Sequence, residues 1–147
     1  MWVETGIEYD KYWKGNPPHM LPQDLPTWHR WHERNAEKFL SFYYDVRLTV
    51  NEIIETDYTQ NMVDMWYSNV AKRIDAVGIK EKEIWVLEVT DIANLRAIGQ
   101  AITYRFLWRR LIPGPKEILS GIVCQGMDND ILAVCGGYRI MPIIVRP

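Results

Sequence analysis

Apolar and polar residues follow two different periods along residues 24–147. In three segments the apolar residues recur about every 3.6 positions, which predicts helices, and in five they alternate or run on unbroken, which predicts strands. The predicted helices span 24–40, 93–111 and 128–135, and the predicted strands span 45–50, 73–79, 83–90, 117–124 and 140–145. This order, αβββαβαβ, begins as an antiparallel meander and continues with β-α-β crossovers. It predicts an α/β (α+β) fold in which helices flank both faces of a mixed central sheet.

Individual residues refine these elements. Asp24, followed closely by Pro26, is typical of a helix start. The apolar side of that first helix consists of Trp28, Trp31, Ala36 and Phe39. Strand 83–90 carries apolar residues on both faces, as a central strand does, whereas Pro142 predicts that the last strand is an edge. Residues 55–71 fit a short helix or a packed loop equally well.

Residues 1–23 are rich in proline, glycine and aromatic residues and show neither period. They predict an irregular N-terminal arm that precedes a single domain of residues 24–147. The arm either packs on that domain or extends to a partner. If Trp2 and Trp13 are exposed, they indicate a protein interface, because tryptophan is enriched at the centres of interfaces.

Two carboxylates, Asp75 and Glu88, interrupt neighbouring apolar strands. A buried carboxylate is costly unless it is paired, protonated or bound to a cation, so the pair is a candidate metal site. Since side chains alternate along a strand, Glu88 and Thr90 face the same side, and Asp75 can lie across from them. A Mg²⁺ ion would use both carboxylates, a backbone carbonyl near residue 89 and several waters.

The predicted helix after strand 83–90 adds a polar stripe to this region. Arg96, Gln100 and Tyr104 lie four residues apart and therefore share one helix face. Because only a short turn joins the strand to the helix, the stripe can lie over the two carboxylates. A cation held there would position an attacking water and stabilise charge on a phosphate.

Asp75, Glu88 and the Gln100-x-x-x-Tyr104 pair resemble the motifs of the PD-(D/E)XK nuclease superfamily, closest to its RecB-like exonuclease branch. The order of elements over about residues 24–145 also resembles the core of that superfamily. The resemblance implies hydrolysis of DNA phosphodiesters with Mg²⁺ or Mn²⁺, and it implies that Asp75 and Glu88 are the metal ligands. Gln100 and Tyr104 would orient the site or touch the DNA backbone.

The chain departs from that pattern at Thr90, where active members of the superfamily usually carry a lysine. Threonine has no positive charge with which to polarise the water. Lys80 and Lys82 lie in the turn at the far end of the hairpin, so Arg96 is the better substitute. Arginine stays protonated, however, and cannot share a proton with water as lysine can.

Structural roles are open for the same residues. The two strand carboxylates could pair with Arg73, Arg96 or backbone donors, and the glutamine and tyrosine of the stripe could satisfy each other. His29 and His32 have a spacing that could chelate a metal, but no third ligand follows, so they predict a solvated helix face.

The first helix offers one more acidic candidate. In RecB-like nucleases a glutamate from this helix sometimes completes the metal shell, a place that Glu33 or Glu37 could take. Pairing with Arg30 and Arg34 on the helix surface is the simpler alternative.

Composition narrows the classes of function. The 147 residues have a net charge of −2, which is unlike a dedicated DNA-binding domain. The basic clusters are Lys72-Arg73 and Arg105, Arg109 and Arg110, which suit solvated faces and a helix C-terminus. Charges interrupt every apolar run, so no membrane span is predicted. Cys124 and Cys135 lie in apolar segments, which favours small packed thiols in an intracellular protein over a disulfide.

Two functional hypotheses remain. The first is a nuclease-fold protein with a degenerate active site that works as a structural or interaction module. The segments PPHMLPQDLPTWHRW and GQAITYRFLWRRLIPGP resemble sequences of small phage proteins. This resemblance implies a virion component near the head–tail connector. Such a module would form homo-oligomers and would bind protein partners through residues 1–23. The alternative is an active Mg²⁺- or Mn²⁺-dependent DNA nuclease, with Arg96 in place of the lysine. The expected location is the cytoplasm of a host cell or the virion.

Overall fold

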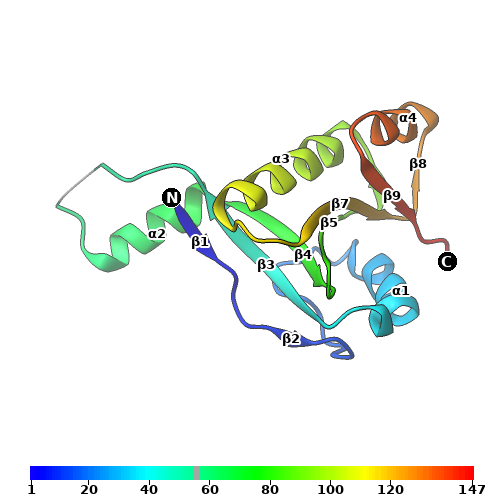
Figure 1. The fold of residues 1–147 in the computed structure, drawn as a ribbon, viewed down its shortest axis with the longest axis horizontal. Coiled ribbons are helices and arrows are strands. Elements are labelled where there is room, and N and C mark those ends of the chain that lie inside the picture. Colours follow the sequence, from blue (N-terminus) through cyan, green and yellow to red (C-terminus); the bar gives the residue numbers. More distant parts are fainter. Residues whose placement is uncertain (55–56) are drawn as a thin grey trace.

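The computed structural model describes residues 1–54 and 57–147, which form an α/β structure. In these residues seven strands make one mixed sheet, two short strands make a second sheet, and there are four α-helices (Figure 1). The helices are α1 (Leu25–Asn35), α2 (Gln60–Val70), α3 (Leu95–Leu111) and α4 (Asn129–Gly137), and a 3₁₀ turn, η1 (Ala36–Lys38), follows α1. The large sheet contains β1 (Trp2–Glu4), β2 (Tyr9–Asp10), β3 (Ser41–Thr49), β4 (Lys72–Ile79), β5 (Glu83–Val89), β7 (Glu117–Cys124) and β9 (Ile140–Ile144), and the small one contains β6 (Ile92–Ala93) and β8 (Gly126–Met127).

β5 lies inside the large sheet, in which the order of strands is β1-β3-β4-β5-β7-β9. β3, β4 and β5 pair antiparallel, whereas β5, β7 and β9 pair parallel. The predicted mixed sheet and the predicted inner position of strand 83–90 are therefore confirmed. β9, which contains Pro142, ends the sheet as the edge strand that the proline predicts.

Helices cover both faces of this sheet, as the order of elements predicts (Figure 1). On one face α1 packs Trp28 and Trp31 against Phe42 of β3. On the other face α3 packs Leu107 and Trp108 in a separate cluster with strand residues. The four apolar residues predicted for the first helix are all buried, and each large one stabilises the fold by about 1.5–3 kcal/mol. No helix in the described residues is long and apolar enough to cross a membrane.

The N-terminal residues are not irregular throughout, because β1 and β2 both pair with β3. Without them β3 would present unpaired backbone groups at the edge of the meander. Trp2 stacks on Tyr67 with ring centroids 5.7 Å apart, and the ring of Trp13 lies 4.4 Å from that of Tyr9. Both tryptophans are half-buried. The arm therefore packs on the domain, and the tryptophans do not meet the condition of exposure that would indicate an interface.

The structure corrects the prediction for one other segment and decides between the two alternatives for another. β3 begins at Ser41, before the predicted strand 45–50, because Phe42 and Tyr44 lie among other aromatic residues and obscure the alternation. In the ambiguous stretch 55–71, residues 60–70 form α2, whose N-cap Thr59 accepts a hydrogen bond from an amide of the first turn. Residues 55–56 of that stretch lie outside the described residues.

Candidate functional site

Two adjoining cavities, of about 390 and 250 Å³, lie beside the end of β5. Asp75, Arg96 and Gln100 line both cavities, which together are called the acidic cleft below. The larger cavity is also lined by Pro18, His19, Asp45, Ala71, Lys72, Arg73 and Tyr104, and the smaller by Leu21, Asp24, Glu88, Val89, Thr90, Asn94 and Ala97. The structure thus brings all six residues predicted for the site to one place.

Asp75 and Glu88 approach each other because β4 and β5 are antiparallel neighbours. Ala76 lies opposite Leu87, so continuing this register by one residue places the two carboxylates opposite each other. The amide of Val89 donates a hydrogen bond of 2.8 Å to Oδ2 of Asp75. Within the described residues, Oε2 of Glu88 is buried without any hydrogen-bond partner. One oxygen of the pair is therefore available to bind a proton or a cation.

Burial raises the pKa of both carboxyl groups, and the charge of Asp75 raises that of Glu88 further. Burial is the largest cause for Asp75 and raises its pKa to about 6, while the hydrogen bond from the Val89 amide opposes the shift. Burial is also the largest cause for Glu88, the negative charge of Asp75 is the next, and the pKa rises to about 10. The pair therefore retains a proton at neutral pH unless a cation replaces it.

The polar stripe on α3 lies over this pair. Asn94 caps the helix, since its Oδ1 accepts a hydrogen bond of 3.3 Å from the amide of Ala97. Arg96 is exposed, and its charge partly opposes the rise in the pKa of Glu88, although none of the ion pairs in the described residues includes it. Tyr104 is buried, and burial followed by the two nearby carboxylates raises the pKa of its hydroxyl. The stripe thus supplies one exposed cation and two neutral hydrogen-bonding groups.

Thr90 directly follows β5 and lines the smaller cavity beside Glu88. Its amide donates a hydrogen bond of 3.0 Å to the carbonyl of Val123, which fixes the backbone at this point. Lys80 and Lys82 line a different cavity at the turn of the hairpin, and Nζ of Lys80 lies 4.2 Å from the centre of the Trp85 ring. As predicted, neither lysine is placed to supply the charge that Thr90 lacks.

Asp24 also lines the cleft, although its position in the sequence predicts only a helix start. The predicted helix start is confirmed, because Asp24 is the N-cap residue of α1 and a proline lies in the first turn, but the side chain of Asp24 makes no capping hydrogen bond. The residue is buried and lines the smaller cavity, and burial raises the pKa of its carboxyl group. An aspartate before a helix is so common a cap that nothing in the sequence distinguished this one. His19 and Asp45, in the larger cavity, were missed because neither belongs to a recognised motif.

The oxygen donors fit a hydrated divalent cation. Mg²⁺ binds oxygen ligands and is commonly held by one or two carboxylates while it keeps several waters. Asp75 and Glu88 supply two carboxylates, and the unpartnered Oε2 of Glu88 is a free ligand atom. In the described residues no group of three or more His, Cys, Asp and Glu is arranged to hold a metal ion. Water would therefore complete the coordination shell.

The structural alternatives for these residues find only partial support. Asp75 does accept a backbone hydrogen bond, but Arg73 pairs with Asp45 instead, at 2.8 Å. His32 is buried and its Nε2 lies 2.7 Å from the carbonyl of Lys11, so the predicted solvated face is wrong for this histidine. Its ring packs on that of Phe42, with ring centroids 5.3 Å apart.

Glu33 and Glu37 do not join the cleft. Both are exposed and line a separate cavity with His32. The acidic residue that this part of the chain brings to the cleft is Asp24 instead. Cys124 and Cys135 are free and buried in one apolar cluster, as predicted.

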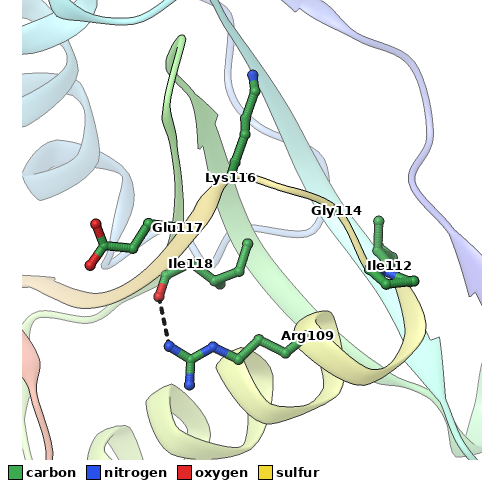
Figure 2. Close-up of a pocket in the computed structure, with 7 residues that line it drawn as sticks. Arg109, Ile112, Gly114, Lys116, Glu117 and Ile118 are labelled. Carbon is green, nitrogen blue, oxygen red and sulfur yellow. Dashed lines mark hydrogen bonds between the residues drawn. The ribbon is translucent and has the colours of Figure 1, made fainter.

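The basic residues near the end of α3 are engaged with backbone carbonyls. Arg105 donates hydrogen bonds of 2.6 Å to the carbonyls of Tyr138 and Arg139, just after α4. Arg109 donates one of 3.3 Å to the carbonyl of Ile118 and borders a cavity of about 290 Å³ (Figure 2). These contacts join α3 to the rest of the fold, so the cluster has a structural role whether or not it meets a ligand.

None of the family models, curated proteins and solved structures compared with this chain matches it. Function is therefore inferred from the geometry of the acidic cleft and from the resemblance of its motifs.

Proposed function

We propose that this chain is a nuclease of the PD-(D/E)XK type, which hydrolyses DNA phosphodiesters with Mg²⁺ or Mn²⁺ held by Asp75 and Glu88. One observation carries the proposal. Arg96 lines both cavities of the cleft together with Asp75, so α3 brings a cation to the cavities that hold the carboxylates, where the usual lysine is absent. The expectation that Arg96 substitutes for that lysine required this placement.

The order of elements supports the proposal. α1 precedes the antiparallel meander β3-β4-β5, and α3 then crosses to the parallel strand β7. This is the αβββαβ order of the superfamily core, and it brings the second and third strands of the meander side by side. Asp75 and Glu88 occupy those two strands, at the end of the hairpin that faces α3.

Each residue of the cleft has a role in this chemistry. The bound cation would polarise an attacking water and offset charge on the phosphate. Arg96 is exposed at the cleft and always protonated, so it can hold a phosphate oxygen by charge-assisted hydrogen bonds. The half-buried Gln100 and the buried Tyr104 would orient the floor of the cleft, while Thr90 offers a hydroxyl beside Glu88.

Cleavage assays with purified variants test the proposal. Single- and double-stranded DNA would be incubated with Mn²⁺ or Mg²⁺ and the wild-type chain, Asp75→Ala or Glu88→Ala. Wild-type cleavage that both variants lose is expected. Arg96→Ala should slow cleavage by about 100-fold or more, since it removes one group that stabilises transition-state charge. Thr90→Lys in the Arg96→Ala background should restore part of the rate, and its failure would argue that the cleft is not built like the superfamily site.

The second candidate is an interaction module that has lost catalysis, and Thr90 in the position of the lysine is the observation that favours it. Such a module would be a virion component near a head–tail connector, would assemble into homo-oligomers and would contact other proteins or DNA. It would be found in a host cytoplasm or in the virion. Absence of both cleavage and metal binding by calorimetry would favour this candidate, whereas cleavage that depends on Asp75 would exclude an interaction-only role.

A further inference from the structure

Two residues of the acidic cleft have an unusual backbone conformation. In the described residues the non-glycine residues with positive φ are His19 (61°), Asp45 (51°) and Arg139 (55°). The first two lie in the larger cavity of the cleft, where Oδ2 of Asp45 is 3.5 Å from Nε2 of His19. A left-handed conformation costs free energy at residues other than glycine, and such residues cluster at functional sites.

Asp45 is fixed, whereas His19 is open to the cleft. Nε and Nη2 of Arg73 donate hydrogen bonds of 2.8 and 2.9 Å to the two carboxylate oxygens of Asp45. The side chain of Asp45 is 9% exposed and that of His19 is 63% exposed. A carboxylate beside an imidazole orients the ring. The chain Arg73–Asp45–His19 therefore presents an oriented imidazole to whatever occupies the cleft.

The charges around the cleft indicate what that occupant is. Lys72, Arg73 and Arg96 line the larger cavity, and Asp75 lies on its wall. A cavity of about 390 Å³ lies in the range of small-molecule sites and has room for one nucleotide. Cations beside a buried carboxylate pair that could hold a metal ion suit a phosphodiester.

We infer that His19, oriented by Asp45, is the general acid that protonates the departing oxygen when the cleft hydrolyses a phosphodiester. This inference rests on the function proposed above and assigns a catalytic role to a residue outside the nuclease motif. In the step, the oxygen of water bonds to phosphorus, and the bond from phosphorus to the departing deoxyribose oxygen breaks with its electron pair on that oxygen. The imidazolium of His19 gives its proton to that oxygen and regains one from solvent, which also takes the proton that the attacking water loses.

Two substrates separate proton donation from other roles of His19. DNA has a departing alkoxide that needs a proton, whereas the p-nitrophenyl ester of thymidine 5′-phosphate releases a phenolate that is stable without one. His19→Asn removes the acid, and asparagine tolerates a left-handed backbone well. The matched control is His29→Asn, because His29 lies on α1, outside the cleft, with Nε2 2.9 Å from Oδ1 of Asn16.

With Mn²⁺ present, His19→Asn is expected to slow DNA cleavage by about 100-fold, the usual scale of general-acid catalysis, while the rate on the ester changes less than about threefold. The pH profile of the rate on DNA should differ between the wild type and His19→Asn, because only the wild type carries this acid. His29→Asn should match the wild type on both substrates.

The other outcomes overturn the inference in distinguishable ways. If the wild type cleaves both substrates and His19→Asn loses the same factor on each, or loses nothing, the role of His19 as an acid is wrong while the proposed function stands. If the wild type cleaves neither substrate, the proposed function fails and the role of His19 fails with it.

Discussion

Glu88 is buried beside a second carboxylate, with one oxygen that has no hydrogen-bond partner in the described residues. A side chain in this environment opposes folding at neutral pH, because the unfolded chain releases a proton that the folded chain retains. Stability is commonly sacrificed in this way at active sites, where a group is kept for binding or chemistry. The position of the residue in the middle of the apolar strand β5 made this cost visible in the sequence.

Replacing Glu88 with glutamine is expected to stabilise the protein. The pKa of Glu88 is raised to about 10 and that of Asp75 to about 6, so folding takes up protons above the ordinary carboxyl pKa of about 4. The wild-type free energy of unfolding should therefore fall as pH rises from about 4 to about 6 through both groups, and continue to fall through Glu88 up to about pH 10. Glu88→Gln should exceed it by about 1–3 kcal/mol near pH 7.5 and by little near pH 4.

Urea unfolding at several pH values measures this difference. Glu33→Gln, on the exposed side of α1, is the control and should change the free energy of unfolding by less than about 0.5 kcal/mol. A Glu88→Gln variant that is less stable than the wild type throughout this range would contradict the raised pKa.

The residue scale also shows where sequence patterns fail. Asp75 and Glu88 stood out because each is a charge inside an apolar run, and position alone made them suspect. Asp24 and His19 carry no such contrast, since both lie in a proline-rich segment that shows neither a helix nor a strand period. They reach the cleft because residues 18–24 pack against the end of the sheet, which is a tertiary contact.

At the scale of elements, the ends of the helices follow local chemistry only in part. Asn94 and Asp128 cap α3 and α4 through hydrogen bonds from the amides three residues later. Asp24, in the same position before α1, leaves its helix uncapped and lines the cleft. The same residue type thus serves two purposes, and the choice depends on which surface lies nearby.

A methyl group at Gly78 is expected to disrupt the packing of η1 on the sheet. A Cβ atom there would lie 2.5 Å from Cε1 and 2.7 Å from Cδ1 of Phe39, whose ring is 2% exposed and has little room to move. Gly78→Ala should therefore lower the free energy of unfolding by about 1–3 kcal/mol. Gly99→Ala, in α3, meets no atom within 4 Å and should raise it by about 0.5–1 kcal/mol.

Urea denaturation of both variants beside the wild type checks this pair. Opposite signs are the expected result. A Gly78→Ala protein as stable as the wild type would show that the Phe39 ring has a second place to go.

At the scale of the whole molecule, binding of a divalent ion in the acidic cleft should raise the free energy of unfolding, because only the folded chain brings Asp75 and Glu88 together. Mg²⁺ or Mn²⁺ at ten times its dissociation constant should add about 1.4 kcal/mol to the free energy of unfolding. This corresponds to a rise in Tm of about 3–6 °C for a chain of this size. The rise should be larger at higher pH, since the ion displaces a proton from the carboxyl pair.

Thermal unfolding followed by circular dichroism, with and without the ion, gives the measurement. Addition of EDTA should reverse the shift, and Asp75→Asn should show none. An equal shift in wild type and Asp75→Asn would place the ion elsewhere on the protein.

The sequence by itself determined the strands and helices that form the core, because the periods of apolar residues record which side of each element is buried. β7 has the bounds that its apolar run predicts, and the inner position of β5 follows from apolar residues on both of its faces. Short strands such as β1 and β2 could not be predicted from apolar periods, because they gain stability from pairing with β3 and carry too few residues to show a period.

Only the tertiary structure decided what surrounds the two carboxylates. The register of β4 on β5, the placement of α3 and the packing of residues 18–24 together assemble the cleft from segments far apart in the chain. A pattern along the sequence reports the burial of each residue, but not the identity of its neighbours. For this reason Asp75, Glu88 and Arg96 could be predicted as members of a site, whereas the left-handed pair His19 and Asp45 could not.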